Sequence, residues 1–186
     1  PKTGTLIRDG VPSIINHDDK TGIEAALQLK EQLGGTVTVV SMGPPQADVA
    51  LREALAMGCD DAYLVSAREF GGSDTYATSG IIAAALKKIG YDLIITGRQA
   101  IDGDTAQVGP QIAEKLHLPQ VSYVEEVVEA AADHVVVKRQ FEDGYHIIKI
   151  KTPCLLTAIA ELATPRYMSV RGIVEAYEKE IKVLGF

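Results

Sequence analysis

The residues best suited to chemistry lie in one stretch, 93–110, which reads LIITGRQAIDGDTAQVGP. Its apolar start, 93–95, predicts a buried strand that ends at Gly97, and a polar loop then leads to a helix beginning near Thr105. Many α/β proteins hold nucleotide phosphates at such a helix start, because its free N–H groups and dipole attract negative charge. Asp104 and Thr105 are residue types that cap helices. This loop is therefore the first candidate functional site.

The side chains of the loop limit how a nucleotide can lie against it. Four polar residues and three glycines share it: Asp102, Asp104, Thr105 and Gln107, with Gly97, Gly103 and Gly109. Glycines let a ligand approach the backbone closely, although they also end strands simply to make turns. Carboxylates repel phosphate, so the acids suit ribose, ribityl or adenine amino groups. Phosphate is then left to backbone N–H groups and to Thr105.

Other catalytic patterns are absent or weak. The sequence has no Walker-type GxxxxGK[ST], no GxGxxG and no GxSxG. Its four histidines are scattered, and none pairs with another His or a Cys at ligand spacing, so we expect no metal site. The stretch 71–75 (GGSDT) resembles the loop of ATP pyrophosphatases, but a loop in which Ser73 or Asp74 caps the next helix is the favoured interpretation. Asp18 and Asp19 likewise suit a helix start better than a catalytic dyad.

Composition narrows the class of protein. A chain of 186 residues can bury one full core, and its apolar runs are far too short to span a membrane. The net charge of −7, with no basic stripe and no Trp, argues against nucleic-acid binding. Cys59 and Cys154 form no CxxC pair, which favours reduced, buried thiols in a cytoplasmic protein.

Helical periodicity and apolar runs alternate through the first two thirds of the chain. They predict helices over 18–33, 48–57, 73–89 and 105–116, and strands over 36–42, 61–65 and 93–96. The strands are apolar throughout rather than alternating, which is typical of a parallel sheet covered by helices on both faces. The first fifteen residues predict a hairpin-like loop that enters the first helix.

The pattern changes after Pro119. Strands are predicted over 121–128, 134–140, 145–151 and 155–159, and the segments 135–137 and 147–151 indicate an antiparallel hairpin with one solvated face. A loop, a short helix over 172–179 and a strand over 181–183 follow. We expect a single α/β domain over 1–186, made of a parallel core (1–119), a β-rich part (120–165) and a tail (166–186).

In the nucleotide-type loop and in several shorter motifs, the sequence resembles the β subunit of electron-transfer flavoproteins. The stretch 97–109 (GRQAIDGDTAQVG) is similar to the family's nucleotide loop, and further pieces match in order. They are Asp9-Gly10-Val11 followed by Asn16, then 40–44 (VSMGP), 54–58 (ALAMG) and 165–167 (PRY). The resemblance covers essentially the whole chain.

The resemblance implies a fold of the adenine-nucleotide α-hydrolase type. It implies a heterodimer with an α subunit that holds the electron-carrying FAD, and electron transfer from flavin dehydrogenases such as acyl-CoA dehydrogenases. Carried over position by position, it implies a nucleotide site made of Asn16, His17, Asp18, Asp19, Met42, Gly97, Arg98, Gln99, Ala100, Ile101, Asp102, Gly103, Asp104, Thr105, Ala106, Gln107 and Val108. The flavin carries out the redox chemistry, so we expect no catalytic residue in this chain.

The family also has segments outside this sequence. Its members begin with a strand and a Lys-containing loop before the position of Pro1, and carry a C-terminal arm beyond Phe186. Without that first strand the sheet would expose apolar edges, so we expect the natural chain to have it.

Two features of the resemblance concern cofactor and partner. Some β subunits hold AMP, whereas those of electron-bifurcating systems that oxidise NADH hold a second FAD. AMP-binding members tend to carry a bulkier acidic residue at the position of Gly103, so the glycine here favours FAD over AMP. Val170 takes the place of an apolar anchor in the loop that docks the partner dehydrogenase, although a simple packing valine is the alternative.

Two interpretations from other classes stay open at this point. The chain could be a stand-alone ATP- or AMP-binding sensor of the universal-stress-protein type, but such proteins usually lack the β-rich half and the tail. It could also be an ATP-using adenylating enzyme, on the basis of 71–75. A flavin-containing heterodimer would exclude the second.

Overall fold

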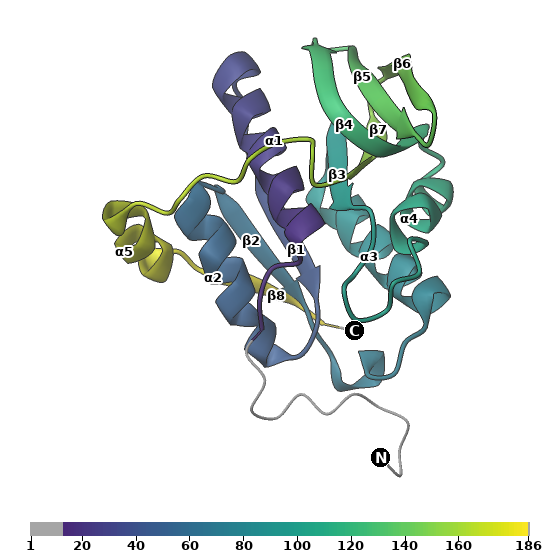
Figure 1. The fold of residues 1–186 in the computed structure, drawn as a ribbon. Helices are drawn as coiled ribbons and strands as arrows, with labels where there is room; N and C mark the ends of the chain where they lie inside the picture. Colours follow the sequence, from purple (N-terminus) through teal and green to yellow (C-terminus); the bar gives the residue numbers. More distant parts are fainter. Residues whose placement is uncertain (1–12, 186) are drawn as a thin grey trace.

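The computed structural model describes residues 13–185, and its elements follow the order that the sequence predicts (Figure 1). The first part holds α1 (His17–Leu33), β1 (Thr38–Met42), η1 (Pro45–Ala47), α2 (Asp48–Met57), β2 (Asp61–Val65), η2 (Arg68–Phe70), α3 (Thr75–Ile89), β3 (Leu93–Gly97) and α4 (Val108–Leu116). The second part holds β4 (Gln120–Ala130), β5 (His134–Phe141), β6 (Gly144–Lys151), β7 (Cys154–Ala158), α5 (Val170–Glu178) and β8 (Ile181–Leu184). Most of the hairpin-like loop predicted for the first fifteen residues, with the motif at Asp9, Gly10 and Val11, lies outside the described residues.

The strands form two sheets within residues 13–185. In one sheet β1, β2 and β8 run parallel, with β2 in the centre. In the other, with the order β3-β7-β4-β5-β6, the first three strands run parallel and the last three antiparallel. The parallel α/β core and the antiparallel hairpin are therefore confirmed. Two facts are new: β1 and β3 belong to different sheets, and the late strands β7 and β8 join the early parallel ones.

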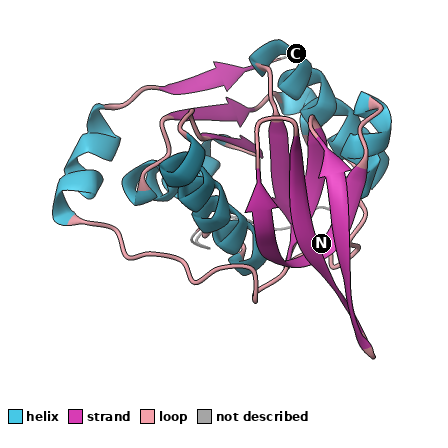
Figure 2. Cartoon of the chain, turned by 90° about the horizontal axis from the view of Figure 1, so that it is seen from above, coloured by secondary structure: helices cyan, strands magenta, loops and turns pink. Residues whose placement is uncertain are grey.

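Helices cover both faces of the parallel strands, as neighbouring residues on one strand show. Ile94 packs in a core cluster with residues of α3 and α4, whereas the next residue, Ile95, lies against Gly22 of α1. On β1, Val39 packs in the cluster around α2 and Val40 in the cluster around α3 and α4. Because successive side chains of a strand point to opposite faces, α1 and α2 lie on one side and α3 and α4 on the other. Figure 2 shows these helices on either side of the strands.

The helix ends lie within two residues of their predicted positions, except for the start of α4. Asp74 caps α3 by accepting a hydrogen bond from the N–H of Ala77 at 2.8 Å, which confirms the capping interpretation of 71–75. The helix α5 begins two residues earlier than predicted, because the hydroxyl of Ser169 accepts the N–H of Gly172 at 2.9 Å. The prediction that α4 begins near Thr105 was wrong, because the helix begins at Val108.

Both cysteines are buried thiols, as the sequence predicts. Cys59 and Cys154 are free and buried, and burial raises the pKa of each thiol to about 11. No helix in the described part of the chain is long and apolar enough to cross a membrane.

Candidate functional site

The loop between β3 and α4 is the exposed part of the site. Residues 100–105 are exposed, and the N–H of Asp104 donates to the carbonyl of Ala100 at 3.0 Å, which closes a turn. The side-chain amide of Gln99 also donates to the carboxylate of Asp104. Asp104 and Ala106 have φ of 55° and 53°, so the chain bends sharply between the turn and α4. This bend explains why neither Asp104 nor Thr105 caps α4: the helix starts later, after Gln107, and has no side-chain cap.

The first turn of α1 holds the beginning of this loop through side chains. The Asp19 carboxylate accepts the N–H of Gly97 at 2.6 Å and the side-chain amide of Asn16 at 2.8 Å. The same amide of Asn16 donates to the carbonyl of Gln99 at 2.8 Å. Next to them, Nε of Arg98 lies 3.6 Å from a carboxylate oxygen of Asp18. Six predicted site residues from two distant segments are thus brought together.

Asp19 also has a perturbed carboxyl group. Burial raises its pKa above the ordinary range, while the hydrogen bonds from Asn16 and Gly97 act in the opposite direction and the nearby charge of Asp18 raises it further. Both bonds are donated to Asp19, so the geometry fits the carboxylate form. A position in the first helical turn favours that charge.

Two glycines let the loop ends sit close to their neighbours. A Cβ on Gly97 would lie 2.8 Å from the backbone nitrogen of Asp19. One on Gly109 would lie 2.7 Å from the hydroxyl of Thr96 and 3.0 Å from the methyl of Thr157. At Gly103, in contrast, a Cβ would meet nothing within 4 Å. The two end glycines are required by packing, and the middle one opens onto free space.

The start of α3 borders the other side of the loop. The hydroxyl of Thr75 donates to the side chain of Gln107 at 3.1 Å, and one turn later Ser79 donates to Gln111 at 3.0 Å. These contacts place the starts of α3 and α4 side by side. With α1, three helix N-termini therefore surround the loop, and each directs a partial positive charge toward it.

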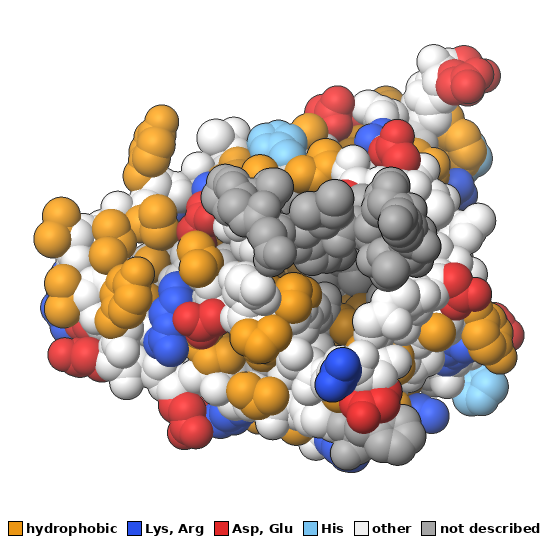
Figure 3. All heavy atoms as spheres, turned by 90° about the horizontal axis from the view of Figure 1, so that it is seen from below, with side chains coloured by type: hydrophobic (Ala, Val, Ile, Leu, Met, Phe, Trp, Pro, Cys, Tyr) orange, Lys and Arg blue, Asp and Glu red, His pale blue; other side chains and the backbone are white. Residues whose placement is uncertain are grey.

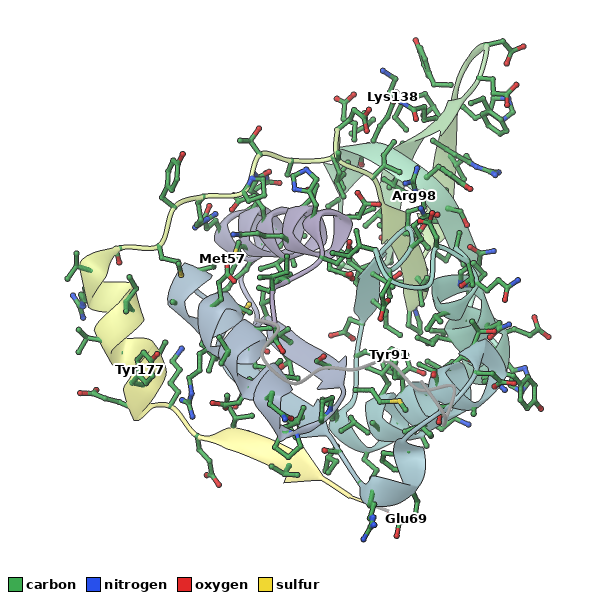
Figure 4. The ribbon with its side chains drawn as sticks, turned by 60° about the horizontal axis from the view of Figure 1, so that its bottom comes forward. Met57, Glu69, Tyr91, Arg98, Lys138 and Tyr177 are labelled. Carbon is green, nitrogen blue, oxygen red and sulfur yellow. The ribbon has the colours of Figure 1, made fainter. Side chains whose placement is uncertain are left out.

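These groups fit an anionic nucleotide. The N-terminus of α4 has no side-chain cap, the Arg98 guanidinium lies at this end of the molecule, and the hydroxyl of Thr96 is a buried polar atom without a hydrogen bond (Figure 4). The N–H groups of Gly97 and Arg98 are already bonded, to Asp19 and to the carbonyl of Ala158. Backbone contacts to a phosphate must therefore come from later in the loop.

Two predicted site residues, His17 and Met42, lie outside this network of contacts around the loop. His17 is exposed at the first position of α1, and Met42 is the last residue of β1, in the other sheet. Thr75, which ends the stretch 71–75 and was not among the residues predicted for this nucleotide site, also borders the loop. Its partner Gln107 lies 32 residues further along the chain, so neither periodicity nor a local motif could have revealed the contact.

The anchor predicted in the tail lies at the other side of the molecule. Val170 is 81% exposed at the start of α5, and other exposed apolar side chains surround it: Tyr167, Met168, Ile173, Val174 and Tyr177. We call these six residues the docking face. Figure 3 shows apolar side chains gathered on this side, and Figure 4 shows Tyr177 far from Arg98.

Fold and site together define an α/β protein with a nucleotide-type loop after a parallel strand. The model of the electron transfer flavoprotein domain matches residues 3–185, and the chain belongs to this family. It is 61% identical over 185 residues to the electron transfer flavoprotein subunit beta of Thermoanaerobacterium thermosaccharolyticum, covering 99% of this chain and 71% of the relative. The resemblance found from the sequence motifs is therefore confirmed.

Two further relatives carry names that mention reductases. The chain is 57% identical over 185 residues to the caffeyl-CoA reductase-Etf complex subunit CarD of Acetobacterium woodii, covering 98% of this chain and 70% of that one. It is 56% identical over 187 residues to the acryloyl-CoA reductase electron transfer subunit gamma of Anaerotignum propionicum, with the same coverage.

Proposed function

We propose that this chain acts in a heterodimeric electron-transfer flavoprotein, where it holds FAD in the β subunit. It passes electrons between a flavoenzyme of the acyl-CoA dehydrogenase type and the FAD of the α subunit, and takes part in bifurcation from NADH. Family membership and the names of the two reductase-associated relatives support this role. The stand-alone sensor is not favoured, because the family match extends through the β-rich half and the tail. The free, buried cysteines support a cytoplasmic location.

The observation that carries the proposal is the loop held between three helix starts. In this proposal Arg98, Thr105 and the N–H groups at the start of α4 hold the diphosphate, and the loop acids hold the hydroxyl groups of the sugar. The bound flavin supplies the electron-transfer chemistry, while the protein fixes its position and keeps its diphosphate bound. The open space at Gly103 supports FAD over AMP, because a longer ligand needs room to extend beyond the loop.

Counting cofactors in the purified heterodimer tests this assignment. We expect two FAD per αβ pair and no AMP; one FAD with one AMP would contradict both the FAD assignment and the bifurcating role. Gly103→Asp should lower the FAD content of the β site, because it adds a charged side chain where the ligand extends. Ala132→Asp, which adds the same charge to the exposed β4–β5 turn, is the matched control and should keep two FAD.

The docking face is proposed as the surface for the partner flavoenzyme. It is an apolar cluster on one short helix and the segment just before it, which is typical of protein interfaces rather than of free surface. Both reductase-associated relatives match this chain through essentially its whole length, α5 included. These observations favour a CoA-ester reductase or dehydrogenase as the occupant of this face.

A further inference from the structure

The docking helix α5 touches the rest of the molecule through very small residues. A Cβ on Gly172 would lie 2.6 Å from the carbonyl oxygen of Ala56 on α2, a distance that real Cβ atoms do not reach. One turn further along, Ala176 is 1% exposed and packs in the core cluster formed with α2. The axis of α5 therefore lies as close to α2 as the absence of side chains permits.

The C-terminal end of α5 is held by a side chain of α2. Nη1 of Arg52 donates to the carbonyl of Ala176 at 2.7 Å and to the carbonyl of Lys179 at 2.5 Å. Its guanidinium also lies 5.8 Å from the ring centre of Tyr177, within reach of a cation–π contact. Helix C-termini leave carbonyl groups without partners and favour a nearby cation, and Arg52 meets both needs. Lys179 adds a bond from its ammonium to the carbonyl of Cys59 at 2.8 Å.

Both chain segments that flank α5 are fixed as well. Before it, the Arg166 guanidinium binds Glu24 at 2.8 Å and Glu31 at 2.6 Å, both on α1. After it, β8 pairs with β2 in the parallel sheet. Figure 2 shows α5 at the edge of the molecule, after a long connection from β7 and before a short link to β8. A helix in that place would move easily if nothing joined it to α2, so Gly172 and Arg52 decide where the docking face points.

We propose that Gly172 and Arg52 are positioning residues, which fix α5 on α2 and so set the orientation of the docking face toward the partner flavoenzyme. The inference rests on the proposed docking role of this face. Neither residue needs to touch the partner. Gly172 sets the distance between the two helices, and Arg52 sets the position of α5 along its own axis.

The test uses the full heterodimer with its partner flavoenzyme as electron donor. Gly172→Ala pushes α5 outward, and Arg52→Gln removes the double contact to the carbonyls. We expect each to raise the KM for the partner about five- to tenfold, while kcat at saturating partner and the flavin content stay the same. Gly22→Ala, in the helix α1, is the matched control, because its new methyl group would lie 2.9 Å from the side chain of Ile95 on β3. It should lower stability but leave the KM for the partner unchanged.

A third variant separates this inference from the proposed function. Val170→Asp places a charge in the docking face without disturbing α2, and it should raise the KM strongly. An unchanged KM in Val170→Asp would show that the face does not dock the partner, so that the proposed function fails there. A raised KM in Val170→Asp with normal values in Gly172→Ala and Arg52→Gln would overturn the positioning role alone. Loss of flavin or of kcat in both positioning variants would overturn it too, because the effect would then be general. If Gly172→Ala does not fold, Arg52→Gln carries the test.

Discussion

The nucleotide loop and the docking face are both exposed, but the molecule fixes them in different ways. The loop after β3 is held through its backbone, by side chains of Asn16 and Asp19 and by two glycines that allow close packing. The docking face is held through the helix α5 and the segments that flank it, while its own side chains are exposed. The difference fits the roles proposed for the two surfaces. A phosphate is bound by backbone N–H groups, whose positions must be exact to a fraction of an ångström, whereas a protein partner is met by side chains that can adjust.

The helix α1 contacts both regions. Its first turn binds the loop through Asn16 and Asp19, and its later turns bind Arg166, which lies just before the docking face. Four predictions separate the regions, starting with the largest effect.

Substitution in the nucleotide region should be the most damaging. Gly109→Ala forces a methyl group against Thr96 and Thr157 at 2.7 and 3.0 Å, and should cost about 3 kcal/mol of the free energy of unfolding, the upper range for overpacking. The start of α4 then moves, so flavin content should fall as well. Denaturant unfolding and cofactor analysis measure both. Gly103→Ala in the same loop meets no neighbour and should change stability by less than about 0.5 kcal/mol. Equal losses in the two variants would contradict the packing explanation.

The contact between α1 and the segment before α5 should have an intermediate effect. Glu24 is 5% exposed and Arg166 is 34% exposed. Removal of Arg166 leaves a buried carboxylate unpaired, and we expect Arg166→Ala to cost about 2 kcal/mol, less than for a fully buried pair because water screens the arginine. The flavin content should stay unchanged, because the loop contacts of α1 lie in its first turn. A loss of flavin in this variant would mean that the two regions are coupled through α1.

The same pair gives a dependence on pH. Burial alone would raise the pKa of Glu24, but the hydrogen bonds from Arg166 and Gln28 outweigh it, and the pKa lies below its ordinary value of 4.5. Stability from this ionised carboxylate is present above about pH 4.5 and is lost as the pH falls through the lowered pKa. The stability difference between the natural chain and Arg166→Ala should therefore shrink below pH 4.5. A constant difference down to pH 2 would contradict this role for Glu24.

The order of elements and the position of the candidate nucleotide loop could be predicted from the sequence, because both depend on local patterns. Apolar runs such as 93–95 mark buried strands wherever they pair, and the loop motif is continuous in the chain. The split into two sheets could not be predicted, because β7 and β8 pair with strands about 60 and 120 residues earlier. The predicted start of α4 was wrong because the positive φ of Asp104 and Ala106 bends the chain there, so that neither Asp104 nor Thr105 caps the helix. The contacts of Thr75 and of Arg166 leave no trace in local sequence.

The smallest effect should come from the docking face, where one side chain can change without moving the backbone. Val170 is 81% exposed, so Val170→Ala should leave the free energy of unfolding within about 0.5 kcal/mol and the flavin content unaltered. Loss of its apolar contact should weaken binding of the partner flavoenzyme by about 1 kcal/mol, or roughly fivefold in Kd, as measured by calorimetric titration of the heterodimer. Val49→Ala, a similarly exposed valine on α2 outside the docking face, is the control and should bind normally. If Val170→Ala binds as tightly as this control, the valine contributes nothing to docking, and the docking role proposed for this surface is contradicted at Val170.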